Sequence, residues 1–161
     1  MQFIADFHIH SKYSRATSKL TDIGHLYVYS KFKGIDILGT GDFTHPQWFN
    51  DLKTNLKLEE NGLYTIKDGV INNLGDKNLI ELNNIFKKKI YFMPTAEIAC
   101  IFKDKDKNRR LHIVLIASSL ESVEKLNRKL AEIGNIHSDG RPILGIHAKK
   151  LLEICLNFEY R

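Results

Sequence analysis

The sequence predicts a single α/β domain, and three observations support this class. Short apolar runs alternate with segments of helical periodicity, as in proteins built from successive β and α elements. The 161 residues fit one domain, and a hydrophobic content of 43% supplies enough apolar side chains for a core. No repeat, low-complexity linker or apolar run of about 20 residues interrupts the alternation. We therefore expect one globular domain over residues 1–161, with neither an export signal nor a membrane span.

The first half of the chain is divided by capping residues, glycines and a proline. A threonine can cap a helix, a proline is tolerated in the first turn, and a glycine suits the left-handed position after the last turn. An Asp-Gly pair is typical of a tight hairpin. The expected elements are a strand at 2–7, a helix from Thr21 to Gly34, a strand at 35–38, a helix opened by Thr44 and Pro46, and a hairpin turn at Asp68-Gly69.

The second half follows the same alternation. Ser118 and Glu121 have the spacing of a capping box, and Gly134 is expected to end the helix that follows. The remaining expected elements are a helix at 76–86, strands at 90–93 and 98–102, a charged turn at 103–110, a strand at 111–117 and a last helix at 148–156. Most residues capable of chemistry fall at the ends of these strands.

Charge and cysteine content limit the possible partners and the compartment. Twenty-four Lys and Arg against nineteen Asp and Glu give a formal charge of +5, which permits nucleic acid as a partner without establishing it. Cys100 and Cys155 are the only cysteines and have no CxxC spacing, so neither a disulfide framework nor a thiolate zinc knuckle is expected. A reducing cytosol and a cytoplasmic location fit this composition.

His8 and His10 form the first candidate ligand pair. They are two residues apart at the end of the first expected strand, so their side chains leave the same face and can converge on one ion. The alternative is a pair of polar residues on an exposed strand edge.

Three further residues are candidate ligands, each with an alternative. Asp42 follows the second strand in a glycine-rich turn, where it could also serve as a capping residue. Glu97 borders an apolar run, so burial of its carboxylate needs a cation, which can be a metal or a Lys or Arg partner. His112 lies in an apolar strand, where a core histidine is the alternative to a ligand.

The segment Asp6–Ser11 resembles the D-x-H-x-H-S motif that opens the polymerase and histidinol phosphatase (PHP) superfamily of metal-dependent phosphoesterases. Within it the chain is most similar to the endonuclease Q family. The segments that carry this likeness are 8–16, 31–34, Gly39–Asp42 with His45-Pro46, 107–112 and 138–145. The resemblance implies the amino-terminal portion of a distorted (β/α)7 barrel with the carboxy-terminal strands missing.

The resemblance also implies roles for particular residues. His8 and His10 would hold one ion, Glu97 would bridge two ions, and His112 would hold the second. Asp42 would be a metal ligand and catalytic residue in or beside the cluster. The residues expected to contact DNA phosphates are Arg15, His45, Lys107 and Arg109.

The chain departs from the family pattern in two respects. Arg15 and Phe43 stand where many PHP phosphatases have acidic or histidine ligands; His45 could substitute for the missing histidine or could be an exposed residue at a helix start. No residue after Ile146 supplies the family's later histidine or its closing D-x-H motif. We therefore expect a fragment or shortened homologue with little activity of its own.

The implied function is metal-dependent phosphodiester hydrolysis in DNA repair, with cleavage on the 5′ side of deaminated bases or abasic sites. The expected cofactors are divalent ions, with zinc favoured by the imidazole ligands and manganese or magnesium as alternatives. The expected partner is DNA that contains deaminated bases. Two other functions stay open: a PHP-type phosphoesterase for small molecules, and a non-catalytic remnant that binds metal or nucleic acid.

Overall fold

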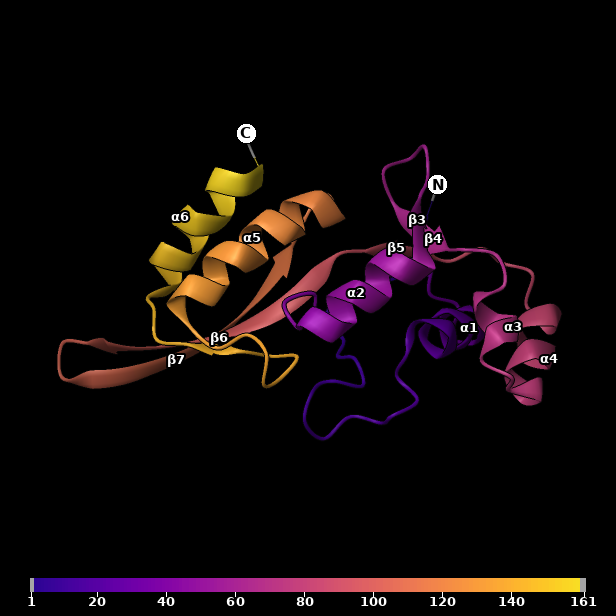
Figure 1. Ribbon diagram of the computed structural model, residues 1–161, viewed down its shortest axis with the longest axis horizontal. Helices are drawn as coiled ribbons and strands as arrows, with labels where there is room; N and C mark the ends of the chain where they lie inside the picture. Colours follow the sequence, from indigo (N-terminus) through magenta and orange to yellow (C-terminus); the bar gives the residue numbers. More distant parts are fainter. Residues whose placement is uncertain (1, 160–161) are drawn as a thin grey trace.

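Two β-sheets that meet at Pro94 organise the computed structural model, which describes residues 2–159 (Figure 1). The first sheet and the helices within residues 23–85 form one half of an elongated molecule, and a long β-hairpin with the helices within residues 120–159 forms the other. This arrangement confirms the mixed α/β class. The described residues do not close a barrel.

The first sheet has the strand order β1-β2-β5-β4-β3. Its strands are β1 (Ala5–Asp6), β2 (Ile37–Gly39), β3 (Leu56–Leu58), β4 (Tyr64–Ile66) and β5 (Tyr91–Met93). β1, β2 and β5 are parallel, so the segments that follow them emerge at the same edge of the sheet. These segments contain residues 7–10, 40–42 and 94–97, and this edge is where the candidate ligands lie.

Helices α1 (Ile23–Lys33) and α2 (Pro46–Asn55) form where they were predicted, but the residues that cap them differ. The N-cap of α1 is Asp22, whose carboxylate accepts from the backbone of His25, while the Thr21 hydroxyl donates to the Ser18 carbonyl. Gly34 ends α1 with φ 77°, as expected. The N-cap of α2 is His45, which makes no side-chain capping bond, and Pro46 follows at the first position.

The predicted hairpin turn at Asp68-Gly69 is wrong. The hairpin between β3 and β4 turns earlier, around Gly62 with φ 79°, where the Glu59 amide donates to the Leu63 carbonyl at 2.9 Å. Gly69 instead precedes the short helix α3 (Val70–Asn73), which the sequence did not predict. Helix α4 (Lys77–Ile85) follows, with the carboxylate of Asp76 as its cap.

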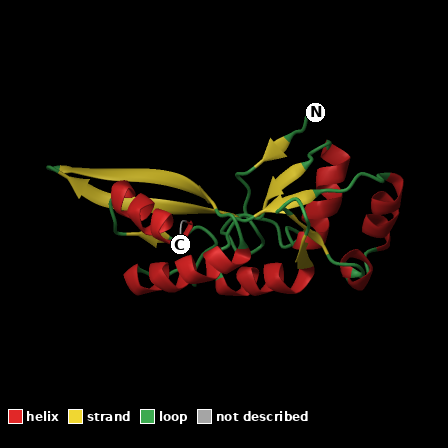
Figure 2. Cartoon of the chain, turned by 90° about the horizontal axis from the view of Figure 1, so that it is seen from above, coloured by secondary structure: helices red, strands yellow, loops and turns green. Residues whose placement is uncertain are grey.

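The second sheet has the order β7-β6-β8 and contains a hairpin much longer than predicted. β6 (Thr95–Asp104) and β7 (Lys107–Ile116) are antiparallel, and the two-residue strand β8 (Ile143–Leu144) pairs with β6 in parallel. The expected charged turn at 103–110 is limited to Lys105 and Asp106, because the residues on either side continue the strands. Figure 2 shows the hairpin extending beyond the helices.

Helices α5 (Leu120–Ile133) and α6 (Ala148–Glu159) cover one face of the second sheet. Residues Val123, Leu130 and Leu151 of these helices are buried with Ile98 of β6 in the common core. The N-cap of α5 is Ser119 rather than Ser118, and Gly134 ends the helix in an extended conformation. Within residues 2–159, no helix combines the length and the apolar character that crossing a membrane requires.

Candidate metal centre

His8, His10 and Glu97 converge where the two sheets meet. The segment after β1 presents both histidines, and their Nε2 atoms each lie 3.0 Å from Oε2 of Glu97 on β6. One ligand atom from each residue lies within 4.8 Å of the other two, which makes the group a possible metal site. The expected convergence of the two histidines with Glu97 is therefore observed. The His8 side chain is 56% exposed, so the site is open to solvent.

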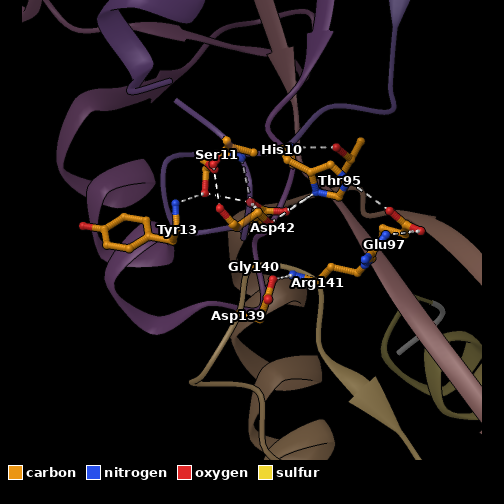
Figure 3. Close-up of polar contacts among 12 residues, drawn as sticks. His10, Ser11, Tyr13, Asp42, Thr95, Glu97, Asp139, Gly140 and Arg141 are labelled. Carbon is orange, nitrogen blue, oxygen red and sulfur yellow. Dashed lines mark hydrogen bonds and ion pairs between the residues drawn. The ribbon is translucent and has the colours of Figure 1, made fainter. Parts of the chain in front are cut away.

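Glu97 is a buried carboxylate surrounded by cationic or hydrogen-bonding groups. Its side chain is only 2% exposed, and Arg141 Nη1 lies 3.8 Å from Oε1. Burial alone would raise the pKa of Glu97, but the hydrogen bond from His8 and the charges of Arg141 and the neighbouring histidines outweigh it and lower the pKa. Figure 3 shows Arg141 directed toward Glu97. Both cation types weighed from the sequence, a metal and an arginine, thus have a place at this carboxylate.

His112 reaches Glu97 from the neighbouring strand β7. Its Nδ1 lies 2.6 Å from Oε1 of Glu97, the oxygen opposite to the one that His8 and His10 approach. Its side chain is 51% exposed, so it is not a core histidine. His112 is outside the group of three, yet a carboxylate with imidazoles at both oxygens has the layout of a bridging ligand.

Asp42 lies on the opposite side of the His10 ring from Glu97, and it is not one of the three residues whose ligand atoms converge (Figure 3). It is fully buried, and its Oδ1 accepts from His10 Nδ1 at 2.9 Å. Its Oδ2 accepts from the Ser11 amide at 2.6 Å, the Ser11 hydroxyl at 2.7 Å and the Ser14 hydroxyl at 2.9 Å. Histidines that hold metals are commonly oriented in this way by a carboxylate on the second ring nitrogen.

The contact between Asp42 and His10 shifts both pKa values. Hydrogen bonding to Asp42 is the largest influence on His10 and raises its pKa, although burial acts in the opposite direction. Burial alone would raise the pKa of Asp42, but the hydrogen bonds from His10, Ser11 and Ser14 outweigh it and the pKa is lowered. Asp42 is therefore ionised at neutral pH and favours the His10 tautomer that carries its proton on Nδ1.

Two glycines allow the backbone to pack closely around this pair. A Cβ on Gly41, which has φ 62°, would lie 2.4 Å from the Ile9 carbonyl oxygen. A Cβ on Gly140 would lie 2.2 Å from Asp42 Oδ2 and 2.3 Å from Ser14 Oγ. Ser14, Gly140 and Arg141 were not predicted as site residues from the sequence. Only their position in the segments similar to endonuclease Q could have indicated a role in the site.

Arg15 and His45, two of the expected phosphate contacts, lie in different environments. Arg15 is 86% exposed at the side chain and its Nε lies 3.1 Å from Asp139 Oδ2, next to the loop that carries Arg141. His45 is buried, stacks on Tyr13 with 4.5 Å between ring centroids, and has no hydrogen-bond partner at Nδ1 among the described residues. Burial lowers the pKa of His45. It is therefore not the exposed residue at a helix start considered from the sequence.

Lys107 and Arg109, the other two expected phosphate contacts, lie near the tip of the hairpin. Both are exposed, and Arg109 Nε lies 3.6 Å from Asp104 Oδ2. They lie five and three residues before His112 on β7, and these odd spacings place them on the opposite face of the strand. The structure therefore does not bring them to the ligand group.

Comparison with known proteins gives similarity over most of this chain but over a minor part of each relative. No family model matches the sequence. The uncharacterized protein MJ0043 of Methanocaldococcus jannaschii is 32% identical over 150 residues, which are 92% of this chain and 14% of that protein. The chain thus spans about one seventh of this curated relative.

Two solved structures of endonuclease Q are similar to the fold. The lesion-specific endonuclease PfuEndoQ from Pyrococcus furiosus matches 97% of this chain with a TM-score of 0.69 and 28% identity. An endonuclease Q in complex with a 27-mer duplex substrate, with an abasic lesion at the active site, matches 97% with a TM-score of 0.70 and 29% identity. The chain covers 32% and 33% of those two chains. Its structural neighbours are therefore endonuclease Q proteins, of which it matches about a third.

Proposed function

We propose that this chain carries the metal-binding part of an endonuclease Q-like, PHP-type site that hydrolyses phosphodiester bonds in damaged DNA. One observation carries the proposal: His8, His10 and Glu97 present their ligand atoms to a common point within 4.8 Å of one another. The similarity to lesion-specific endonucleases supports the choice of DNA as substrate.

The donor set fits a divalent ion with a preference for imidazole. Zinc bonds to histidine nitrogen and carboxylate oxygen are about 2.0–2.2 Å long. The Nε2 atoms that face Glu97 at 3.0 Å therefore need only small shifts to surround an ion. Because Asp42 accepts a hydrogen bond from Nδ1 of His10, Nε2 carries the lone pair that can bind an ion. Zinc suits these ligands best, and manganese is the alternative.

Each residue then has a separate role. His8 and His10 hold one ion, Glu97 bridges, and His112 holds a second ion at the opposite oxygen of Glu97. Asp42 is a positioning residue that fixes the ring of His10. A bound divalent ion supplies a water of lowered pKa and neutralises charge on the phosphate. Arg141 and Arg15, on the rim, offer guanidinium groups to the phosphate.

The openness of the site favours a polymer over an enclosed small molecule. Small-molecule sites usually bury most of their ligand in a cavity. Two of the larger hollows, of about 370 and 410 Å³, are lined by residues such as Lys31 and Asn127 and include none of the candidate ligands. His8 and His112, in contrast, are more than half exposed at the side chain. A duplex can approach such a surface, and cleavage beside deaminated bases or abasic sites is the reaction we assign to it.

The test is a nicking assay on two duplexes that differ only at one deoxyuridine or deoxyinosine. With zinc or manganese added, cleavage of the damaged duplex alone is expected, with loss of cleavage in chelator and in His8→Ala or Glu97→Gln. The exposed histidine His137 provides a matched control, and His137→Ala should cleave as the unsubstituted chain does. Equal cleavage of both duplexes would exclude lesion specificity, and hydrolysis of small phosphate esters alone would favour the phosphoesterase function.

A further inference from the structure

The register of the β6–β7 hairpin separates its side chains into two faces. Residues paired across the strands share a face, and the faces alternate along each strand. The pairs Glu97 with Val114, Ala99 with His112, Ile101 with Arg110 and Lys103 with Asn108 place these residues on the face of the metal ligands. We call this the ligand face. The alternate pairs, which include Ile98 with Ile113, form the face that packs against the core.

The basic residues of the hairpin are divided between these faces. Lys103 and Arg110 belong to the ligand face, and Ile143 of β8 extends that face because it pairs with Ala99. Lys107 and Arg109 belong to the core face, because they pair with Asp104 and Phe102. The register therefore directs the phosphate contacts expected at Lys107 and Arg109 away from the metal centre.

The two pairs also differ in their electrostatic surroundings. Arg109 has a carboxylate neighbour in Asp104, at 3.6 Å. Lys103 and Arg110 are exposed and have no acidic partner among the described residues. Within residues 95–116, Glu97 is the sole acidic residue on the ligand face. Each face thus carries two basic residues and one acidic residue, but the acidic residue is placed differently. Asp104 lies next to Arg109 on the core face, whereas Glu97 on the ligand face is six residues from Lys103.

We propose that the ligand face is a track for a DNA backbone, with Lys103 and Arg110 contacting phosphates of the strand whose scissile bond lies at His8, His10 and Glu97. This inference rests on the proposed function, because it takes the metal centre as the fixed end of the track. The exposed apolar side chains of Val114 and Ile143 lie on the same face, opposite Glu97 and Ala99 and therefore nearer to the metal ligands than to Lys103. Helices α5 and α6 pack on the opposite face, where Val123 and Leu151 are buried with Ile98.

The length of the track sets where it meets the DNA. Lys103 follows Glu97 by six residues on one strand, which corresponds to about 20 Å at roughly 3.3 Å per residue. Successive phosphates of one DNA strand are about 3.4 Å apart along the helix axis. Lys103 should therefore meet the backbone about six nucleotides from the scissile phosphate. Arg110 pairs with Ile101, which follows Glu97 by four residues, and should meet it about four nucleotides away. The twist of the two-stranded ribbon lets this face follow the curvature of a groove.

The experiment compares two double variants that remove the same charge from opposite faces, Lys103→Gln/Arg110→Gln and Lys107→Gln/Arg109→Gln. Binding of a labelled duplex is measured by fluorescence anisotropy over a range of salt concentrations, with chelator present so that no cleavage occurs. Each lost phosphate contact reduces the slope of log K against log salt by about 0.9. The ligand-face variant should lose about 1.8 from the slope, and the core-face variant should keep the slope of the unsubstituted chain.

A charge-retaining variant, Lys103→Arg/Arg110→Lys, should restore the slope, which separates loss of contact from loss of folding. Equal effects of the two charge-removing variants, a larger effect on the core face, or no salt-dependent binding by the unsubstituted chain would each overturn the track. A zinc titration of the same proteins shows whether the DNA track or the proposed metal site is the part that is wrong. If zinc binds normally while the two faces behave alike, only the track is wrong; if the faces differ but zinc does not bind, the metal function is wrong.

Discussion

His10 is held between two carboxylates, and this position decides its chemistry. Nδ1 contacts Asp42 at 2.9 Å and Nε2 contacts Glu97 at 3.0 Å. The buried Asp42 is also held by Ser11 and Ser14, so its orientation is fixed by hydrogen bonds from a separate loop. The ring of His10 is therefore held in place by Asp42, and in the proposed site Asp42 would act on a metal only through His10.

Replacing Asp42 tests this indirect role. Asparagine tolerates the left-handed backbone at this position, where φ is 48°, so Asp42→Asn should fold. Loss of an orienting carboxylate typically lowers metal affinity by about 10–100-fold, and we expect a loss of this size in a zinc competition titration. Asp51→Asn, at a partly exposed aspartate paired with Lys12, is the control. Unchanged affinity would show that Asp42 does not orient a ligand, and complete loss would mark it as a ligand itself.

The raised pKa of His10 gives the metal-free and metal-bound chains opposite pH dependences. A histidine whose pKa is raised by folding stabilises the fold fully below its unfolded pKa of about 6.5, and this stability is lost as pH rises through the folded pKa. Metal binding needs the neutral imidazole, so zinc affinity increases over the same range.

We therefore expect the urea midpoint of the metal-free chain to fall as pH rises above about 6.5, and the stabilisation by zinc to grow. Equilibrium unfolding at a series of pH values, with and without zinc, measures both trends. His10→Gln should flatten the metal-free trend. The same pH dependence in that variant would assign the titration to another group.

At the scale of elements, hydrophobic periodicity and helix-end signals predicted most helices and the glycines that end α1 and α5, but not the N-cap residues of α1, α2 and α5. Adjacent candidates compete at each start, as with Thr21 and Asp22 or Ser118 and Ser119, and the path of the preceding loop decides between them. At the hairpin tip, the alternation of Lys and Asp favours a long turn when the sequence is considered alone. Cross-strand pairing, which depends on residues far along the chain, extends the strands to Asp104 and Lys107 instead.

His8, His10 and Asp42 were predictable because they follow the parallel strands β1 and β2, whose carboxyl ends meet at one edge. Gly140 and Arg141 were not predicted as site residues, since they reach the site on a loop about a hundred residues from Asp42. Nothing in the local sequence around Gly140 shows that it faces a buried carboxylate.

That loop gives a sharp stability prediction. In Gly140→Ala the new Cβ would lie 2.2 Å from Asp42 Oδ2 and 2.3 Å from Ser14 Oγ. Neither group can move away without breaking the hydrogen bond between them. Overpacking of this kind costs about 1–3 kcal/mol, which should appear as a lower urea midpoint. Gly145→Ala is the matched control, because a Cβ at Gly145 would have no atom within 4 Å. Equal midpoints for the two variants would contradict the close packing of the loop on Asp42.

At the scale of the whole molecule, the candidate ligands come from both halves. His8 and His10 follow a strand of the first sheet, whereas Glu97 and His112 belong to the second. An ion held by all four residues therefore links the two sheets across their junction at Pro94. The same junction places these candidate ligands at the base of the hairpin, where the proposed DNA track begins.

This linkage predicts that zinc stabilises the molecule as a unit. A ligand that binds only the folded state at 100 times its dissociation constant adds about 2.7 kcal/mol. Thermal unfolding with excess zinc should therefore show one transition at a higher Tm than in chelator. His8→Ala/His10→Ala should lose the increase, while His137→Ala should keep it. Two separate transitions with zinc would show that the ion does not couple the sheets.

The most direct test of the metal centre is anomalous diffraction at the zinc absorption edge from crystals grown with zinc. The account predicts a peak between Nε2 of His8, Nε2 of His10 and a carboxylate oxygen of Glu97, about 2.0–2.2 Å from each. A second peak would lie between Glu97 and His112. Zinc bound only elsewhere, for example at the exposed His137, with His8, His10 and Glu97 still in direct contact, would contradict the central claim.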